Sequence, residues 1–464
     1  MSESTASEAA TSARHDIAGL ITEIGDVPVT TEPVQLRRKS RDYFWYSPIL
    51  NSQLRGRTAD VVAMPRTEQD VVTVVSACAR RRVPLTVRGA GTGNYGQAVP
   101  LRGGVLLDLA ALDAVIWRKP GVVRVASGAR MGEIDVALRP TGEELRMHPS
   151  TKRSATIGGF IAGGSGGVGS VTYGWLREPG NLIAARIVTV EPLPRIIELR
   201  GDAVHKVNHA YGTTGIITEL EMPVSPALPW IDVVVAFDDM FETARFAQAA
   251  AMADGINKKL LTAIAWPLPT HFGALRKHCP DGKHLLIAMV AEASLESFWT
   301  LLHHFRGEAT YQAACDESPG EVPLYEYTWN HTTLQVLKTD RNVTYLQCLF
   351  PPDRVIEAVR ELAERFGDEV MQHLEFVRFG GRVTASALPV VRYTSPARLD
   401  EIISLHEAAG VGIANPHVYT LEDGSRHKQP DADQLGFKHE VDPMGLLNPG
   451  KMRSFVPRRA ATTR

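Results

Sequence analysis

The segment that decides the fold is Arg88–Ala98, which reads R-G-A-G-T-G-N-Y-G-Q-A. Its four closely spaced glycines let backbone N–H groups converge on one point, a nest that suits a phosphate. A Rossmann dinucleotide loop must open a helix, because the helix N-terminus holds the pyrophosphate. Here strands are predicted on both sides of the loop, at residues 85–87 and 104–109. The pattern argues against a nicotinamide Rossmann enzyme, and a flexible linker is the alternative to a phosphate site.

A second glycine cluster lies at Pro149–Gly174 and reads P-S-T-K-R-S-A-T-I-G-G-F-I-A-G-G-S-G-G-V-G-S-V-T-Y-G. Each glycine loses extra backbone entropy on folding, so this density is costly unless a large ligand needs close backbone approach. Within the cluster, Thr156–Gly159 could present a hydroxyl and amide groups to a phosphate or a ring system. A mobile lid is the alternative interpretation. Taken together, the two clusters predict a site that wraps around a dinucleotide diphosphate.

The bulk composition excludes several classes of protein. With 464 residues, 44% hydrophobic and 22% charged, the chain is long enough for two or three soluble domains. A formal net charge of −2 gives no basic field for nucleic acid, and no apolar stretch is long enough to span a bilayer. The four cysteines form no C-x-x-C pair, so neither an iron–sulfur cluster nor a metal site is expected. These features, and a start without a secretory signal, predict a cytoplasmic protein.

Strand and helix patterns divide the chain into predicted parts. The first part alternates strand and helix, and Thr67 with Asp70 gives a helix N-cap signature. After a proline-rich boundary at residues 223–229, strand–helix pairs recur, which favours an α+β domain with one sheet covered by helices on one face. The expected parts are a disordered tail (1–30), a two-lobed domain (31–228, with lobes at about 55–115 and 120–228), a substrate or cap domain (229–431) and a C-terminal return to the first domain (432–457).

Five segments, in order, resemble the FAD-binding domain of the vanillyl-alcohol oxidase / p-cresol methylhydroxylase (PCMH) superfamily. They are the two glycine clusters, Arg177–Leu182, Tyr211–Glu219 and Asp442–Lys451. The first loop is most similar to that of glycolate- and D-lactate-oxidising members. The resemblance implies an α+β fold in which a two-lobed PCMH-type domain holds FAD and a cap domain holds the substrate. It also implies that the substrate passes hydride to the flavin.

The resemblance assigns particular residues to the cofactor. The expected FAD-binding residues are Arg88, Gly89, Ala90, Gly91, Thr92, Gly93, Asn94, Gly96 and Gln97 in the first loop, Pro149, Ser150, Thr156, Gly158, Gly159, Ser165 and Gly166 in the second cluster, Gly212, Gly215 and Ile217 in the next segment, and Asn448 and Lys451 in the C-terminal return. Relatives with covalently bound flavin often carry a histidine in the first loop, where this chain has Thr92 and Gly93. We therefore expect noncovalent FAD.

Two aromatic segments of the cap carry candidate catalytic bases. Oxidation of an alcohol carbon needs a base that takes the hydroxyl proton, and a neutral histidine suits this role. The candidates are His331 and His417, with Tyr327 and Tyr419 as hydrogen-bond partners. A structural role for each histidine is the alternative.

One cationic side chain of the cap is a candidate for substrate binding. Arg378 lies beside two phenylalanines and could hold a substrate carboxylate in a bidentate pair, although a position on the solvated face of a strand is the alternative. Trp329 and Tyr345 are expected in the core rather than at the substrate.

These observations favour an FAD-linked oxidase or dehydrogenase that acts on a hydroxyl-bearing small molecule, either a hydroxy acid or an alcohol. Relatives that oxidise hydroxy acids usually carry E-H-G-I-G where this chain has I-A-N-P-H-V-Y at residues 413–419, so the substrate class stays open. A C–N or aromatic-alcohol oxidase, and a flavin-binding electron-transfer subunit of a larger complex, are the alternatives. A separate electron-acceptor protein and a homodimer stay open as partners.

Overall fold

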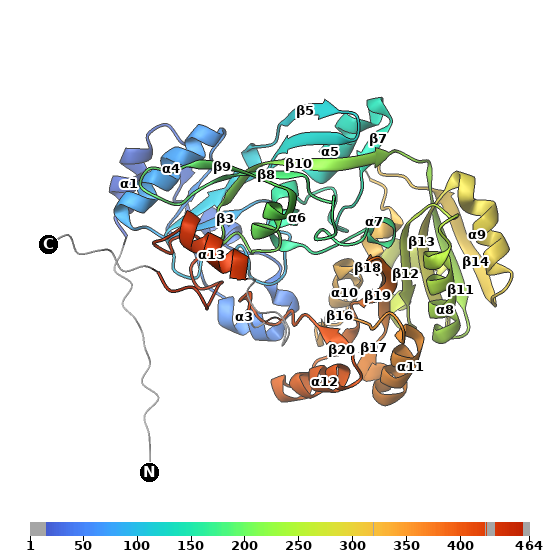
Figure 1. Ribbon diagram of the computed structural model, residues 1–464. Coiled ribbons are helices and arrows are strands. Elements are labelled where there is room, and N and C mark those ends of the chain that lie inside the picture. Colours follow the sequence, from blue (N-terminus) through green and yellow to red (C-terminus); the bar gives the residue numbers. More distant parts are fainter. Residues whose placement is uncertain (1–14, 319, 423, 425–431, 458–464) are drawn as a thin grey trace, which may run out of the picture.

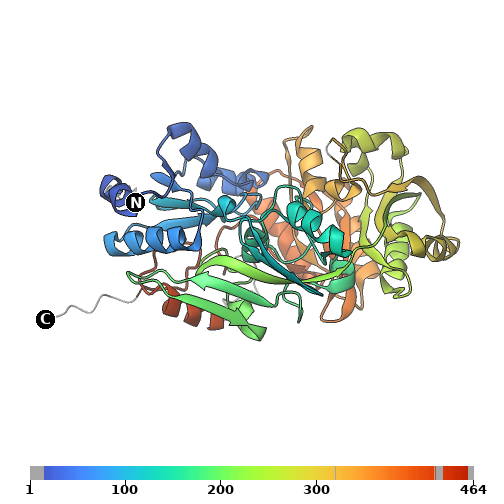
Figure 2. The same cartoon turned by 90° about the horizontal axis from the view of Figure 1, so that it is seen from above.

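The structure is a computed structural model that describes residues 15–318, 320–422, 424 and 432–457 (Figure 1). Two bodies lie side by side in it. One contains the two N-terminal sheets and the helix α13 (Ala432–Val441), and the other contains a large sheet with its helices (Figures 1 and 2).

The first lobe is a four-stranded sheet in the order β1-β2-β4-β3. Its strands are β1 (Val29–Thr30), β2 (Val61–Ala63), β3 (Leu85–Arg88) and β4 (Val105–Asp108), and its helices are α1 (Ile17–Ile24), α2 (Pro33–Lys39), α3 (Pro48–Leu54) and α4 (Glu68–Arg81), with the short 3₁₀ helices η1 (Phe44–Tyr46) and η2 (Leu109–Ala111). The predicted N-cap of α4 is confirmed: Thr67 and Asp70 form a reciprocal capping box. The apolar face of α4 (Val71, Val74, Val75) is buried against this sheet.

The expected disordered tail is wrong from residue 17 onward. Residues 1–14 lie outside the described part of the chain, but Ile17–Ile24 forms α1. Asp16 caps this helix through the N–H of Gly19, and Leu20 and Ile24 are buried in the core that α4 shares. The helix is short and follows a polar stretch, so its apolar face gives only a weak pattern in the sequence.

The second lobe is a sheet in the order β5-β6-β10-β8-β9, with β7 paired to β10. Its elements are β5 (Val115–Lys119), β6 (Val122–Ala126), α5 (Met131–Leu138), η3 (Arg139–Thr141), β7 (Glu143–Leu145), α6 (Ile157–Gly163), α7 (Ser170–Tyr173), β8 (Ala184–Val188), β9 (Ile196–Arg200), η4 (Gly201–Lys206) and β10 (Ile216–Pro226). The chain leaves this lobe at Pro226, within the predicted proline boundary.

The other body contains an eight-stranded sheet in the order β14-β11-β13-β12-β18-β19-β16-β21. Its strands are β11 (Trp230–Phe237), β12 (Lys258–Ile264), β13 (His284–Ala291), β14 (Gly307–Ala314), β16 (Cys348–Leu349), β18 (His373–Phe379), β19 (Arg382–Ala387) and β21 (Gly412–Ile413). A small sheet β15-β20-β17 is built from β15 (Val343–Tyr345), β17 (Val370–Met371) and β20 (Val390–Arg392).

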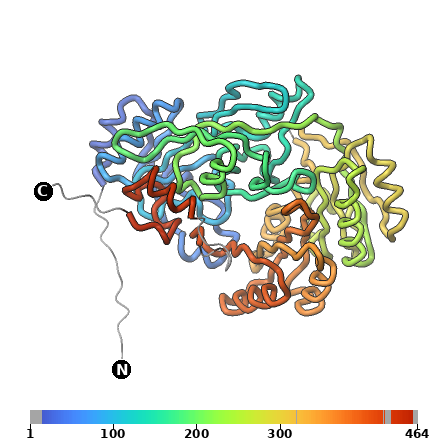
Figure 3. The backbone as a smooth tube through the Cα atoms, in the orientation of Figure 1, coloured from blue at the N-terminus to red at the C-terminus, as the bar shows by residue number. Residues whose placement is uncertain are grey.

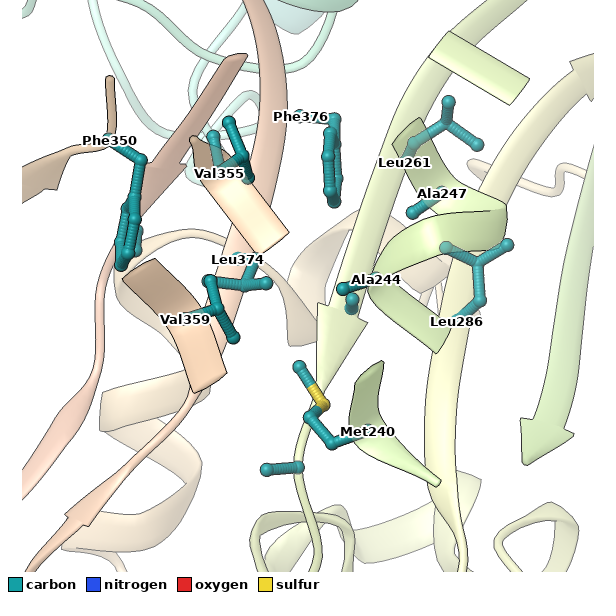
Figure 4. Close-up of a cluster of buried hydrophobic side chains, with 14 of the residues drawn as sticks. Met240, Ala244, Ala247, Leu261, Leu286, Phe350, Val355, Val359, Leu374 and Phe376 are labelled. Carbon is teal, nitrogen blue, oxygen red and sulfur yellow. The ribbon is translucent and has the colours of Figure 1, made fainter. Parts of the chain in front are cut away.

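Helices cover one face of the large sheet as predicted, and a second layer covers the other. The first face packs on α8 (Met240–Met252), α9 (Leu295–Leu302), α11 (Val355–Phe366) and α12 (Pro396–Ala408). Figure 4 shows Met240 and Ala244 of α8 and Val355 and Val359 of α11 against Leu374 of the sheet. The opposite face packs on α10 (Asn330–Leu337) and on 3₁₀ helices η5 (Leu268–His271), η6 (Gly273–His278) and η8 (Leu324–Tyr327). The remaining 3₁₀ helices are η7 (Glu292–Ser294) and η9 (Gly367–Glu369).

The C-terminal segment returns to the first body, as the sequence predicts, but it contains the helix α13 in addition to turns (Figure 3). Val441 accepts a hydrogen bond from the backbone of Val190, and Leu447 lies beside Leu85 as a parallel bridge. The segment therefore touches both lobes. In the described part of the chain, no helix has the length and apolarity that crossing a bilayer demands.

Candidate functional site

The two glycine clusters meet in space. The first loop connects β3 directly to β4 without an intervening helix, as the sequence predicts. Its Gly89 packs so closely on the second cluster that an added Cβ would lie 2.1 Å from Thr156 Oγ1. The loop is anchored by the half-buried guanidinium of Arg88, which donates to the carbonyls of Lys39 (2.7 Å) and Ala90 (2.9 Å). Burial lowers the pKa of Arg88, yet it stays cationic because its ordinary pKa is so high.

The second cluster folds into the short helix α6, which begins at Thr156. Thr156 caps the helix by accepting from the N–H of Gly159 (3.3 Å). Next to it, Gly158 donates its N–H to the carbonyl of Ser127 (2.8 Å), and an added Cβ would lie 2.6 Å from Ser127 Cβ and 2.8 Å from Ser127 O. Only glycine fits there, because 3.0 Å is closer than real Cβ contacts come.

Both clusters line one cavity of about 890 Å³, a size typical of ligand sites. Gly91 and Gly159 face this same space. The predicted cofactor residues that line it are Arg88, Gly89, Ala90, Gly91, Thr92, Gly93, Asn94, Gln97, Pro149, Ser150, Thr156, Gly158, Gly159, Ser165, Gly166, Gly212, Gly215 and Ile217.

Three predicted cofactor residues do not line the cavity: Gly96, which lies within the first loop, and Asn448 and Lys451, which contact that loop from the C-terminal return. The Asn448 side chain donates to the carbonyls of Gln97 (3.1 Å) and Tyr211 (2.6 Å). The ammonium of Lys451 is fully buried and donates to the carbonyl of Gly96. The C-terminal return therefore fastens the first loop from its outer side.

Two polar side chains in the cavity wall are left unsatisfied by the protein. Ser127 Oγ and Asn208 Oδ1 are buried and have no hydrogen-bond partner within the described residues. Buried polar atoms are rarely left unpaired in folded proteins. With the tight glycine cradle, these atoms fit a large ligand that carries hydrogen-bonding groups, as FAD does. Neither residue was predicted, because an isolated serine and asparagine carry no motif signal.

The cap closes the cavity with a mixed polar and apolar wall. The wall consists of Trp329, Asn330, His331, Leu334, Gln347, Cys348, Leu349, Ser386, Leu388, Gly412, Ile413, Ala414 and Asn415. Trp329 belongs to this wall, so the expectation that it lies in the core is wrong. Tyr345, in contrast, is fully buried in the core as expected.

His331 is the predicted base that the fold brings to the cavity. Its Nδ1 lies 3.2 Å from the carbonyl of Glu326, which only accepts, so Nδ1 carries the proton and Nε2 keeps a free lone pair. Burial lowers the pKa of His331 to about 4, with a smaller contribution from Lys338. The imidazole is therefore neutral at pH 7, which a proton acceptor must be.

His417 does not line the cavity, and its two ring nitrogens connect two parts of the chain by hydrogen bonds. It is buried, its Nδ1 accepts from Ser47 Oγ (2.8 Å), and its Nε2 donates to the carbonyl of Tyr345 (2.9 Å). Both ring nitrogens are occupied, so His417 ties the start of α3 to the cap. Burial lowers its pKa to about 4.

The structure does not bring Tyr419, Tyr327 or Arg378 to the cavity either. Tyr419 packs under the first loop, where Lys451 Nζ lies 5.2 Å from its ring centroid. Tyr327 is buried against Phe272. Arg378 pairs with Asp254 at the protein surface, which is the solvated alternative for this residue.

Acid is expected to destabilise the protein partly through His417. Its folded-state pKa of about 4 lies below the ordinary value of 6.5, so between these values the unfolded chain binds a proton that the folded chain does not. Lowering the pH from 7 to 4.5 should therefore remove about 2 to 3 kcal/mol of stability through this group. Urea unfolding at the two pH values should show a smaller loss for His417→Gln than for the unmodified protein, while the exposed His304→Gln should change nothing. An equal acid loss in His417→Gln would contradict this assignment.

The described residues contain no group of three or more histidine, cysteine or acidic side chains that could hold a metal ion. The glycine clusters and the cap wall give the cavity what it needs to bind a large ligand through backbone amides and to exclude water. His331 offers a neutral imidazole to a second molecule at the cap wall.

Comparisons with known proteins agree with this arrangement. Residues 59–191 match the family model described as FAD binding domain. Over 206 residues the chain is 31% identical to the glycolate oxidase subunit GlcD of Escherichia coli (strain K12), a match that covers 42% of this chain and 40% of that subunit. It is 24% identical over 433 residues to a D-lactate dehydrogenase of Archaeoglobus fulgidus, covering 84% of this chain and 91% of that protein.

A solved structure shares the fold. An alkyldihydroxyacetonephosphate synthase aligns with a TM-score of 0.70 at 16% identity, over 94% of this chain and 84% of that one. The match to the glycolate oxidase subunit, in contrast, ends well short of that subunit's full length.

Proposed function

Because residues 59–191 belong to the FAD-binding domain family, we propose that this protein is an FAD-dependent oxidoreductase that oxidises a hydroxyl-bearing small molecule, a hydroxy acid or an alcohol. The observation that carries the proposal is a single cavity lined by both glycine clusters and by the neutral His331 of the cap. The similarity to a glycolate oxidase subunit and to D-lactate dehydrogenases supports 2-hydroxy acids as the first substrates to test.

The two bodies divide the work in this proposal. Residues 31–228 and 432–457 hold the cofactor, and residues 229–431 hold the substrate. The cofactor would be held by the backbone of the first loop, by Thr156–Gly159 and by Gly212, Gly215 and Ile217, with Ser127 and Asn208 as further hydrogen-bonding groups. Bound FAD supplies a hydride acceptor.

The cap residues orient the substrate and move its proton. The free Nε2 of His331 accepts the proton of the substrate hydroxyl, while its Nδ1–H stays bonded to Glu326 O and fixes the ring. Trp329 and Leu334 exclude water from the same wall. The resulting imidazolium returns its proton to solvent when the product leaves.

Anaerobic substrate titration tests this function. The purified protein should be yellow, and its visible flavin absorbance should bleach on addition of glycolate, D-lactate, D-2-hydroxyglutarate or a simple primary or aromatic alcohol. Return of the colour in air would identify an oxidase, and its absence a dehydrogenase. A yellow protein that bleaches only after a partner is added would favour the electron-transfer subunit. A colourless protein that does not take up FAD would overturn the proposal.

The rate of flavin reduction is expected to depend on the protonation state of His331, and therefore on pH. Because the pKa of His331 lies at about 4, the rate should hold as the pH falls from 7 to about 5 and drop as the pH passes through about 4, where the imidazole becomes protonated. His331→Asn should slow reduction by about 100-fold and remove this pH dependence. Stopped-flow reduction at saturating substrate measures both, with the exposed His304→Gln as control. An unchanged rate in His331→Asn would remove His331 from the mechanism.

We also propose that the FAD is noncovalent and that the protein is cytoplasmic. Support for noncovalent binding comes from Thr92 and Gly93, which occupy the loop positions where relatives with linked flavin carry histidine. Acid precipitation should then release all of the yellow colour into the supernatant. All four cysteines are free, which suits a reducing compartment. Gel filtration decides between a monomer and a homodimer, and a panel of acceptor dyes and proteins identifies the electron acceptor.

A further inference from the structure

The backbone of Trp329 adopts a conformation that a side chain rarely tolerates. Its φ of 52° and ψ of −140° lie in the region that normally only glycine occupies. Such a conformation costs free energy and persists only when the surroundings enforce it, which happens mainly at functional sites. Trp329 directly precedes α10, so its backbone sets the direction in which Asn330 and His331 leave the turn.

A buried carboxylate enforces this conformation. Glu375 Oε1, on β18, accepts the backbone N–H of Trp329 at 2.6 Å. The carboxyl group is itself fixed from the sheet: Thr262 Oγ1 donates to Oε2 (2.6 Å), and His373 Nε2 lies 2.7 Å from Oε1 within hydrogen-bond distance. Glu375, Thr262 and His373 are all buried, so they form a rigid support behind the cavity wall.

The supported segment carries two polar groups that the described residues leave unpaired, on two residues that line the cavity. Trp329 Nε1, a donor, and Asn330 Oδ1, an acceptor, are buried and have no partner within the described residues. They belong to consecutive residues and adjoin His331, whose Nε2 has a free lone pair. One donor, one acceptor and one base therefore come from a single turn whose backbone Glu375 holds.

We propose that Glu375 is a positioning residue for substrate recognition, and that Trp329 Nε1 and Asn330 Oδ1 are the specificity-determining contacts it positions. The indole N–H donates to an oxygen of the substrate beside the reacting carbon, and the Asn330 amide oxygen accepts from a second hydrogen-bond donor of the substrate, while His331 takes the proton of the reacting hydroxyl. This inference rests on the proposed function only in taking the ligand of the cap wall to be the hydroxyl-bearing substrate.

Hydrogen–deuterium exchange tests the support without any substrate. In the FAD-loaded protein, Glu375→Ala should speed exchange of the Trp329 amide by about tenfold or more, since its acceptor is gone. Asp232→Ala is the matched control, because this buried carboxylate on the same sheet accepts the backbone N–H of Leu324 (3.1 Å), five residues earlier. It should release Leu324 and leave Trp329 unchanged. Unchanged Trp329 exchange in Glu375→Ala overturns the proposal, and if that variant does not fold, Glu375→Leu, which also lacks an acceptor for the Trp329 N–H, decides by the same criterion.

A double-mutant cycle tests the recognition step. Trp329→Phe removes the indole N–H and should raise the substrate KM for flavin reduction by about tenfold, with a smaller effect on the rate at saturation. In the Glu375→Ala background the same replacement should have little further effect, because the contact is already misplaced. Additive effects would overturn the positioning role. Suppose that no substrate of the panel bleaches the flavin, while Glu375→Ala still speeds exchange of the Trp329 amide. The proposed function has then failed, and the positioning of the Trp329 backbone by Glu375 is retained.

Discussion

A Gly158→Ala variant is expected to weaken FAD binding by about 100-fold or more, because one added methyl group has no room in the cradle. The new Cβ would lie 2.6 Å from Ser127 Cβ and 2.8 Å from Ser127 O, and the second of these is backbone that cannot rotate away. To relieve the overlap, α6 must move from the strand end that carries Ser127. That shift breaks the 2.8 Å hydrogen bond from Gly158 N to Ser127 O and displaces Thr156 and Gly159 from the cavity wall.

The matched control is Gly436→Ala, at a second helical glycine. An added Cβ at Gly436 in α13 meets nothing within 4 Å, so alanine should be neutral or slightly stabilising there. Titration of the apoprotein with FAD, followed by flavin fluorescence, gives the two dissociation constants. Normal FAD affinity in Gly158→Ala would mean that the cradle around Ser127 does not hold the cofactor.

Replacing Lys451 with methionine is expected to destabilise the protein by about 3 to 5 kcal/mol, the usual consequence of removing one partner from a buried charge pair. Lys451 is fully buried, interacts electrostatically with the buried carboxyl of Asp42, and donates to the carbonyl of Gly96. Burial lowers the pKa of Lys451 and raises that of Asp42, while each charge supports the other. Without the ammonium, the buried carboxyl of Asp42 keeps its backbone donors, Phe44 and Ala98, but loses the largest favourable charge interaction that it makes.

Thermal unfolding and FAD retention should both fall in Lys451→Met. The double variant Asp42→Asn/Lys451→Met should recover more than half of the lost stability, because the remaining side chains are neutral. In the unmodified protein the Asp42 carboxylate accepts the backbone N–H of Phe44 at 2.9 Å. The side-chain amide oxygen that Asp42→Asn introduces can accept the same N–H. Additive losses in the double variant would show that the two charges do not act as a pair.

Local glycine spacing together with the resemblance to a known FAD-binding domain was enough to predict most of the residues that line one side of the cavity. The glycine spacing in the first loop and the strands around it fix a β–loop–β unit, and eighteen of the twenty-one predicted cofactor residues line the cavity. Of the three exceptions, Asn448 and Lys451 hold the loop instead of facing the cavity, and Gly96 is the loop residue whose carbonyl accepts from Lys451. A sequence motif indicates which residues the loop requires. It does not indicate on which side of the loop each residue makes its contacts.

The substrate side could not be predicted in the same way. His331 and His417 sit in similar aromatic segments, and only tertiary packing decides that one faces a cavity while the other bridges Ser47 and Tyr345. The support from Glu375 joins residues 46 positions apart, so no local signal announces it. The strained backbone of Trp329 is invisible in a sequence, because its residue type argues for a different conformation.

The fastening of residues 96–97 by residues 448–451 sets the order in which the protein can mature. During vectorial synthesis the phosphate-binding loop emerges more than 300 residues ahead of the two side chains that lock it, as the 351-residue separation between Gln97 and Asn448 requires. In a nascent chain on the ribosome, the first loop therefore lacks the hydrogen bonds from Asn448 and Lys451. The fastening of residues 96–97 is therefore completed only after Asn448 and Lys451 have been synthesised and have docked on the first body.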